Sequence, residues 1–226
     1  MTMNTTATAV RHDDYAAMRQ AMVASQLRTV AVTDPRVVAA MAQVPRENFV
    51  PAASQAMAYR DTAIDLGQGR RMNTPLATAR LLVEARLQPS DSVLLIGAAG
   101  GYTAALLAGL VAEVVAVESL PALAGAAREA LSGTANVTLV EGALEHGHPA
   151  ESPYDVLIVD GAVEEVPMTL VTQLVDGGRI VSGLIENGVY RLAAGARRGA
   201  AFALTPFVDV DSVPLPGFAR PRRFTF

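Results

Sequence analysis

Residues 92–184 alternate apolar runs with helix-forming stretches, and this alternation is the feature that most constrains the fold. Short runs of valine, leucine and isoleucine are typical of buried strands, and the stretches between them are mostly rich in alanine. Strands joined by helices form βαβ units with right-handed crossovers, which produce a parallel sheet covered by helices. The expected strands are 92–96, 114–118, 137–140, 155–160 and 179–184, and the expected helices are 103–111, 120–131 and 167–174.

The chain before this alternation is expected to be mainly helical. Aspartate followed by proline at Asp34 and threonine followed by proline at Thr74 are typical helix starts, with the polar side chain as N-cap and the proline in the first turn. Residues 59–73 show no regular pattern and are expected to be irregular. The helices expected in this part of the chain are 14–28, 35–44, 52–58 and 75–87.

The last forty residues lack helices between their apolar runs, so we expect antiparallel strands at one edge of the sheet. The strand-like runs are 189–197, 201–210 and 223–226. Together these patterns predict an α/β fold, a Rossmann-like, doubly wound, mostly parallel sheet with N-terminal helices and C-terminal edge strands. We expect one domain, built from a helical and substrate-side segment (1–74), a Rossmann-like core (75–186) and C-terminal strands (187–226).

Charge and residue content exclude several classes of function. The chain has no cysteine, which excludes a disulfide framework, a thiolate zinc site and a cysteine nucleophile. Its net charge of −4 gives no general attraction to nucleic acid, so no nucleic-acid partner is expected. No signal peptide and no run of about 20 apolar residues is present, so we expect a cytoplasmic protein without a membrane partner. His146 and His148 lack a third ligand nearby in the sequence, and no metal site is expected.

A glycine-rich turn follows the first strand of the alternation. Glycines at such a position let the backbone approach a ligand closely, and the helix that follows offers unpaired N–H groups. The turn therefore predicts a nucleoside-like cofactor. Ala99 stands where a G-x-G pattern has its second glycine. The residues of the turn are Gly97, Ala98, Ala99, Gly100, Gly101 and Tyr102.

Two acids lie at the expected carboxyl ends of strands, where open α/β sheets bind ligands. Glu118 follows Gly97 by 21 residues, and its carboxylate could accept hydrogen bonds from both hydroxyls of a ribose. The alternative is an exposed acid at a strand end. Asp160 either holds a cationic amino group or orients a substrate, or it caps the next helix.

Two arginines, Arg70 and Arg71, stand just before the helix start at Thr74. Guanidinium groups beside a helix N-terminus favour the binding of an anion such as a carboxylate. The alternative is a capped helix next to two solvated arginines, and the spacing leaves both interpretations open.

Several segments, in order along the chain, resemble the protein-L-isoaspartate O-methyltransferase family. The resemblance runs from about Met18 to Gly183. Members of that family move a methyl group from S-adenosylmethionine to the α-carboxylate of an L-isoaspartyl residue in damaged proteins, and the ester closes to a succinimide as a step of repair. The matching segments are 22–27 (MVASQL), 34–37 (DPRV), 44–51 (VPRENFVP), 58–61 (AYRD) and the turn ending in Gly101-Tyr102.

The resemblance implies S-adenosylmethionine as cofactor and isoaspartyl proteins or peptides as partners. It places Asn73 at the position of a family serine beside the substrate carboxylate, with the Thr74 hydroxyl one residue later, and these two are the predicted catalytic residues. Arg70 and Arg71 replace a usual Gln-Thr. Besides the residues of the turn, the predicted cofactor-binding residues are Glu118, Ser119, Gly142, Ala143, Leu144 and Asp160.

Four positions depart from the family pattern and keep other functions open. Asn73 replaces the serine, Leu95 replaces an acid, Ala99 replaces a glycine and Ala143 replaces an aspartate. A catalytically impaired relative that acts as a binding or interaction module is therefore the alternative. An NAD-dependent dehydrogenase would share the glycine turn and the acid after the second strand, but the wider resemblance argues against it.

Overall fold

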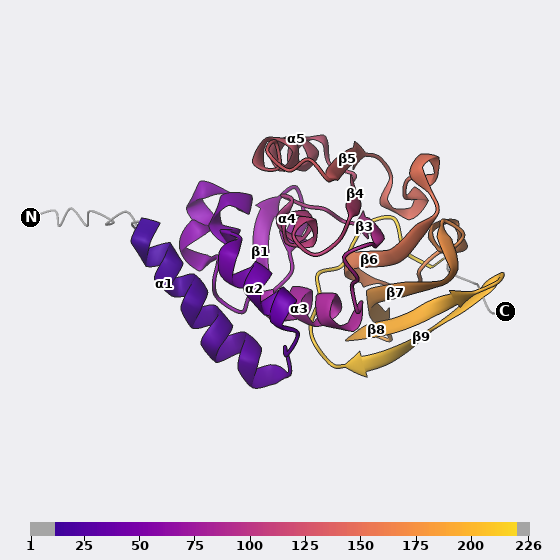
Figure 1. Cartoon of the computed structure of the whole chain (residues 1–226), viewed down its shortest axis with the longest axis horizontal. Coiled ribbons are helices and arrows are strands. Elements are labelled where there is room, and N and C mark those ends of the chain that lie inside the picture. The colour runs from indigo at the N-terminus through magenta and orange to yellow at the C-terminus, as the bar shows by residue number, and fades with distance from the viewer. Residues whose placement is uncertain (1–11, 221–226) are drawn as a thin grey trace, which may run out of the picture.

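The computed structural model describes residues 12–220. Its main sheet contains the strands β3 (Ser92–Ile96), β4 (Glu113–Glu118), β5 (Val137–Glu141), β6 (Tyr154–Val163), β7 (Leu174–Glu186), β8 (Val189–Arg198) and β9 (Ala201–Val208). The spatial order is β5-β4-β3-β6-β7-β8-β9, with parallel pairing from β5 to β7 and antiparallel pairing of β8 and β9 (Figure 1). The predicted α/β sheet with antiparallel C-terminal edge strands is confirmed.

The parallel strands are apolar on both faces because helices or loops cover both. In β3, Val93 and Leu95 belong to one buried cluster, and Leu94 and Ile96 belong to the cluster on the opposite face. Leu95, which stands where the family pattern has an acid, is thus a fully buried core residue. A polar side chain at this position would need hydrogen-bond partners inside the core.

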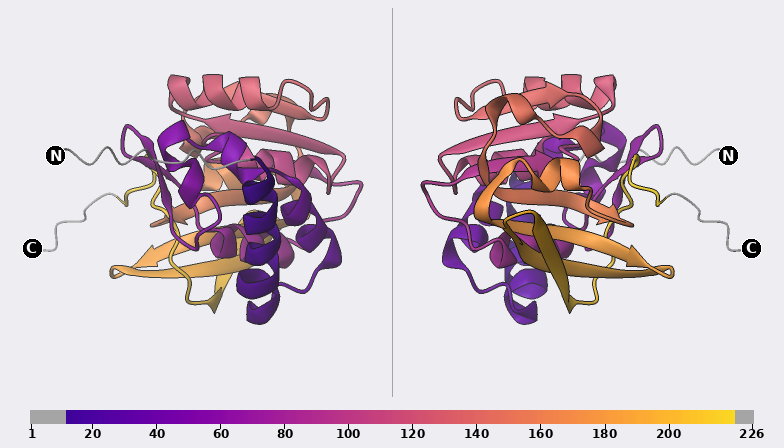
Figure 2. Two further views of the ribbon diagram at one scale, coloured as in Figure 1. Left: turned by 90° about the vertical axis from the view of Figure 1, so that its left-hand side faces the viewer. Right: turned by 90° about the vertical axis from the view of Figure 1, so that its right-hand side faces the viewer.

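The helices that cover the sheet largely follow the prediction. They are α1 (His12–Met22), α2 (Pro35–Gln43), α3 (Pro75–Glu84), α4 (Tyr102–Ala108), α5 (Pro121–Ala130) and α6 (Met168–Val171). A π-helical segment, Val23–Leu27, and a 3-10 turn, Arg28–Val30, extend α1. The views in Figure 2 show the indigo N-terminal helices in front on one side and the orange C-terminal strands in front on the other.

Both predicted helix caps are present. The Asp34 carboxylate accepts hydrogen bonds from the N–H groups of Arg36 and Val37, and the Thr74 hydroxyl accepts one from Ala77. Residues 52–57 form a 3-10 helix where a helix over 52–58 was expected. The expected strand 223–226 lies outside the described residues, and within 12–220 no helix is long and apolar enough to cross a membrane.

A hairpin occupies the segment that the sequence left irregular. Strands β1 (Ile64–Gly67) and β2 (Arg70–Met72) pair antiparallel with each other and form a separate two-stranded sheet. Gly67, Gln68 and Gly69 make the turn with φ values of 86°, 51° and 76°. Because side chains alternate along β2, Arg70 and Met72 are buried and Arg71 is exposed.

Close packing of the glycine turn yields a prediction for stability. A Cβ at Gly100 would overlap the carbonyl oxygen of Phe49, whereas Gly125 in α5 faces open space. We expect Gly100→Ala to lower the free energy of unfolding by about 1–3 kcal/mol through overpacking. Gly125→Ala serves as the control and raises it by up to about 1 kcal/mol because alanine favours the helix. Urea denaturation measures both, and equal effects of the two substitutions would contradict this account.

Candidate functional site

The glycine turn directs backbone donors toward the end of β4. Gly97 and Ala98 donate their N–H groups to the Val117 carbonyl, each at 3.0 Å. Ala99 has a φ of 51°, a left-handed conformation that costs a residue with a side chain about 1 kcal/mol. In this conformation the Ala99 N–H donates to Glu118 Oε2 at 2.8 Å. The turn is therefore hydrogen-bonded to Glu118, the predicted ribose-binding residue.

Glu118 has no exposed surface, so the alternative of an exposed acid at a strand end is wrong. Its carboxylate accepts backbone N–H groups from Ala99, Ser119 and Leu120, and it accepts Nη1 and Nη2 of Arg70 at 2.7 and 3.0 Å. A carboxylate offers about four lone-pair positions. Five N–H donors therefore use the full capacity of this group.

Arg70 and Arg71 have different roles in the structure. The Arg70 side chain is only 4% exposed and forms the bidentate ion pair with Glu118, so the anion that it binds belongs to the protein itself. Arg71 is exposed, and its Nη2 donates to the Ala63 carbonyl at 3.2 Å. The interpretation as solvated arginines therefore applies to Arg71 only.

The loop after β5 lies next to this acid. The Gly142 N–H donates to the Glu118 carbonyl at 3.0 Å, which brings the two strand ends together. Ala143 is exposed and Leu144 packs into a buried core cluster. Gly142 and Ser119 thus contact Glu118, and cofactor binding by the loop residues and Ser119 stays a prediction.

Asp160 is buried within β6 and joins three other segments. Its Oδ1 accepts the Asn73 Nδ2 at 2.7 Å and the Thr78 hydroxyl at 3.4 Å, and its Oδ2 accepts the Thr103 hydroxyl. The helix-cap interpretation is wrong, because the N-cap of the next helix is Pro167. Burial raises the pKa of Asp160, although these hydrogen bonds oppose the change.

Asn73, the predicted catalytic residue, uses both ends of its side-chain amide within the protein. Besides the bond from Nδ2 to Asp160, its Oδ1 accepts the Ser212 hydroxyl at 2.9 Å and the Val213 N–H at 2.8 Å. The residue is only 2% exposed. Asn73 thus ties the start of α3 to β6 and to the chain that follows β9.

A buried arginine, which was not predicted as a site residue, supports this loop. Arg46 donates Nε to the Ala58 carbonyl at 2.8 Å and Nη2 to the Asn73 carbonyl, and its guanidinium lies 4.7 Å from the centre of the Tyr102 ring. Burial lowers the pKa of Arg46 and raises that of Tyr102. Arg46 lies within the segment 44–51, and the resemblance of this segment to the family was the one sequence feature that could have indicated its importance.

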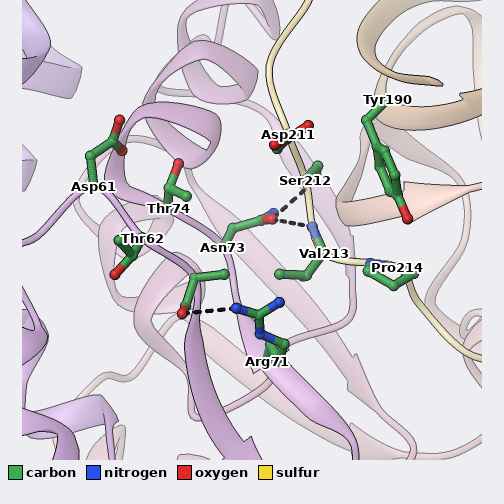
Figure 3. Close-up of a pocket in the computed structure, with 11 residues that line it drawn as sticks. Asp61, Thr62, Arg71, Asn73, Thr74, Tyr190, Asp211, Ser212, Val213 and Pro214 are labelled. Carbon is green, nitrogen blue, oxygen red and sulfur yellow. Dashed lines mark hydrogen bonds between the residues drawn. The ribbon is translucent and has the colours of Figure 1, made fainter. Parts of the chain in front are cut away.

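An open cavity of about 380 Å³ borders the Asn73 loop. Asp61, Thr62 and Thr74 lie on one side of it, and Tyr190 and Pro214 lie on the other (Figure 3). The Thr74 hydroxyl accepts the Ala77 N–H at 3.1 Å, a contact that uses a lone pair and not its proton. The remaining lining residues are Ala63, Arg71, Asn73, Asp211, Ser212 and Val213.

A second space, on the side of the glycine turn, is too narrow to hold a water molecule. Leu215 packs against Gly97, one of the residues that line it. Arg71 and Asn73 border both spaces and thus lie between the open cavity and the narrow space. The narrow space is lined by Arg71, Met72, Asn73, Gly97, Ala98, Ala99, Tyr102, Thr103 and Asp160.

The raised pKa of Asp160 predicts how its substitution changes stability with pH. The folded protein holds the Asp160 proton more tightly than the unfolded chain does. This stabilisation is complete below about pH 4, the unfolded pKa, and is lost as pH rises through the folded pKa. We therefore expect Asp160→Asn to gain stability relative to the parent protein as the pH rises above about 4. Urea denaturation of both proteins at several pH values measures this, and a difference that does not change with pH would contradict it.

Comparisons with known proteins identify the family of the chain. The family model described as Protein-L-isoaspartate(D-aspartate) O-methyltransferase matches residues 17–217. The protein-L-isoaspartate O-methyltransferase of Methanoculleus marisnigri is 38% identical, with 88% of this chain and 91% of the relative covered. The enzyme of that name from Herpetosiphon aurantiacus is also 38% identical, with 91% and 92% covered.

Solved structures show the same fold. A solved protein-L-isoaspartate O-methyltransferase has a TM-score of 0.77 and 25% identity, and the match covers 88% of this chain and 66% of that one. A putative protein-L-isoaspartate O-methyltransferase from Plasmodium falciparum, solved with S-adenosyl-L-homocysteine, has the same fold, with a TM-score of 0.75 at 18% identity. The match covers 87% of this chain and 97% of that one. The chain belongs to the protein-L-isoaspartate(D-aspartate) O-methyltransferase family.

Proposed function

We propose that this protein transfers a methyl group from S-adenosylmethionine to the carboxylate of an isoaspartyl residue in a protein or peptide. The observation that carries the proposal is the position of Arg71 and Asn73 between two spaces, in a chain of this family. One space is an open cavity with room for a side chain and its backbone. The other is lined by the glycine turn, whose Ala99 N–H contacts Glu118, and a nucleoside would bind at this acid.

The residues around Glu118 and the glycine turn suit S-adenosylmethionine, with one exception. The left-handed turn and the buried Glu118 are features that hold a nucleoside in sheets of this type. The exception is Arg70, whose guanidinium holds both carboxylate oxygens of Glu118. With Arg70 withdrawn, Glu118 would keep its three backbone donors and accept the two ribose hydroxyls.

When bound, S-adenosylmethionine supplies a methyl group on a sulfonium sulfur. The acceptor carboxylate oxygen forms the new O–C bond while the S–C bond breaks, and the bonding electron pair stays on sulfur. A carboxylate is ionised at neutral pH, so it needs no base to become a nucleophile. The task of the protein is therefore to align the two groups and to keep water away.

We assign the contact with the acceptor to Arg71 and Thr74. Arg71 is an exposed cation on the cavity wall, and the Thr74 hydroxyl retains a proton to donate. Asn73 acts as a positioning residue because its amide is bonded to Asp160 and to the segment 212–213. Arg46 holds the Asn73 carbonyl and so fixes the same loop.

Methylation of a defined peptide tests the proposed function. We expect label from methyl-labelled S-adenosylmethionine to enter a synthetic isoaspartyl peptide and to leave as methanol in mild base, as an ester does. The same peptide with ordinary aspartate is the control and should stay unlabelled. Equal labelling of both peptides, or no labelling of either, would contradict the proposal.

The assignment of Arg71 predicts a change in KM. Arg71→Gln removes one exposed charge, worth about 1 kcal/mol, and should raise the KM for the isoaspartyl peptide roughly fivefold with little change in kcat. Added salt should reduce the difference, because screening weakens the attraction in the parent protein. Arg60→Gln is the matched control, since Arg60 is exposed nearby but does not line the cavity. A fall in kcat at constant KM would argue against this role.

A further inference from the structure

The Arg70 guanidinium makes the pair of contacts that a ribose would make with Glu118. Its Nη1 and Nη2 donate to the two carboxylate oxygens at 2.7 and 3.0 Å. The vicinal hydroxyls of a ribose also present two neighbouring donors to one carboxylate. The three backbone N–H groups on Glu118 come from the turn and the start of α5 and do not depend on Arg70. Two donors can therefore replace two others without further change at the acid.

The guanidinium and a ribose cannot occupy this place together. Glu118 is fully buried and Arg70 is only 4% exposed, so the pair is enclosed by the protein. Glu118 already accepts five N–H donors, which leaves no lone pair for further hydroxyls. Binding of a nucleoside here requires Arg70 to leave.

Two observations indicate that Arg70 is able to leave. Its Nε is buried without a hydrogen-bond partner in the described structure, so the ion pair leaves one donor unsatisfied, which water would satisfy. Its strand, β2, pairs only with β1, and the turn at residues 67–69 is exposed. Movement of this short hairpin breaks no hydrogen bond of the main sheet.

We propose that Arg70 is an internal competitor for the ribose site, so that the cofactor binds only to molecules in which the Arg70–Glu118 pair has opened. This inference rests on the proposed function, which places S-adenosylmethionine at Glu118. The observed affinity is the intrinsic affinity multiplied by the fraction of molecules in the open form. A minor form populated at a few per cent lowers the affinity between tenfold and a hundredfold.

Calorimetric titration with S-adenosylhomocysteine tests the competition without any turnover. Arg70→Gln keeps a polar side chain but shortens it and removes the charge and the paired donors. We expect its Kd to be at least about tenfold lower than that of the parent protein. Arg60→Gln is the control, because it removes the same charge from an exposed arginine that lines neither space, and its Kd should stay within about twofold of the parent value.

Arg70→Lys is a second variant that tests the competition even if Arg70→Gln fails to fold. Lysine keeps the buried charge but lacks the paired donors, so its Kd should fall between those of the parent and Arg70→Gln. Thermal unfolding without ligand checks that each variant is folded. If the folded variants bind as the parent does or more weakly, the competition is overturned while cofactor binding stands. If neither the parent nor any variant binds at millimolar ligand, the proposed function fails and the inference fails with it.

Discussion

A carboxylate without exposed surface needs donors from the protein, and Glu118 takes them from three separate segments. The glycine turn supplies Ala99, the start of α5 supplies Ser119 and Leu120, and the hairpin supplies Arg70. The positions of these segments relative to one another are thereby fixed by a single side chain. Removal of the carboxylate would leave the buried Arg70 guanidinium unpaired, which is costly in a protein interior.

Asp160 performs a similar task on the other side of β3. Since β4 and β6 flank β3, the two carboxylates stand on either side of the point where the strand order reverses. Asp160 collects donors from the loop before α3, from α3 itself and from α4, at Asn73, Thr78 and Thr103. Buried polar networks of this kind specify one arrangement only when every member is paired. The two acids therefore define the geometry of the space between them.

The sequence predicts the main sheet well because burial leaves a local pattern. The apolar runs of β3, the proline-marked helix starts at Asp34 and Thr74, and the absence of helices after residue 187 were all sufficient to predict their structures. The hairpin was missed because strands of four and three residues around a glycine-rich turn show no periodicity.

Side-chain pairing between distant segments cannot be predicted in this way. Arg70 and Glu118 are 48 residues apart, and nothing in either neighbourhood indicates that they meet. The resemblance placed Asn73 near a substrate carboxylate, but the bonds that engage both ends of its amide come from Asp160 and from residues 212 and 213. Position within a family predicts where a residue lies better than it predicts what that residue contacts.

The bond between Asn73 and Ser212 has a consequence for synthesis of the chain. The two residues are 139 positions apart, so at ribosomal speed Ser212 is added roughly 7–30 s after Asn73. During this interval the Asn73 amide oxygen lacks its donors Ser212 and Val213, and the wall of the cavity formed by residues 211–214 does not exist. The nascent chain is thus able to form its early helices long before it is able to recognise an acceptor. The cavity is therefore completed only after the helices and the main sheet of the described chain have been synthesised.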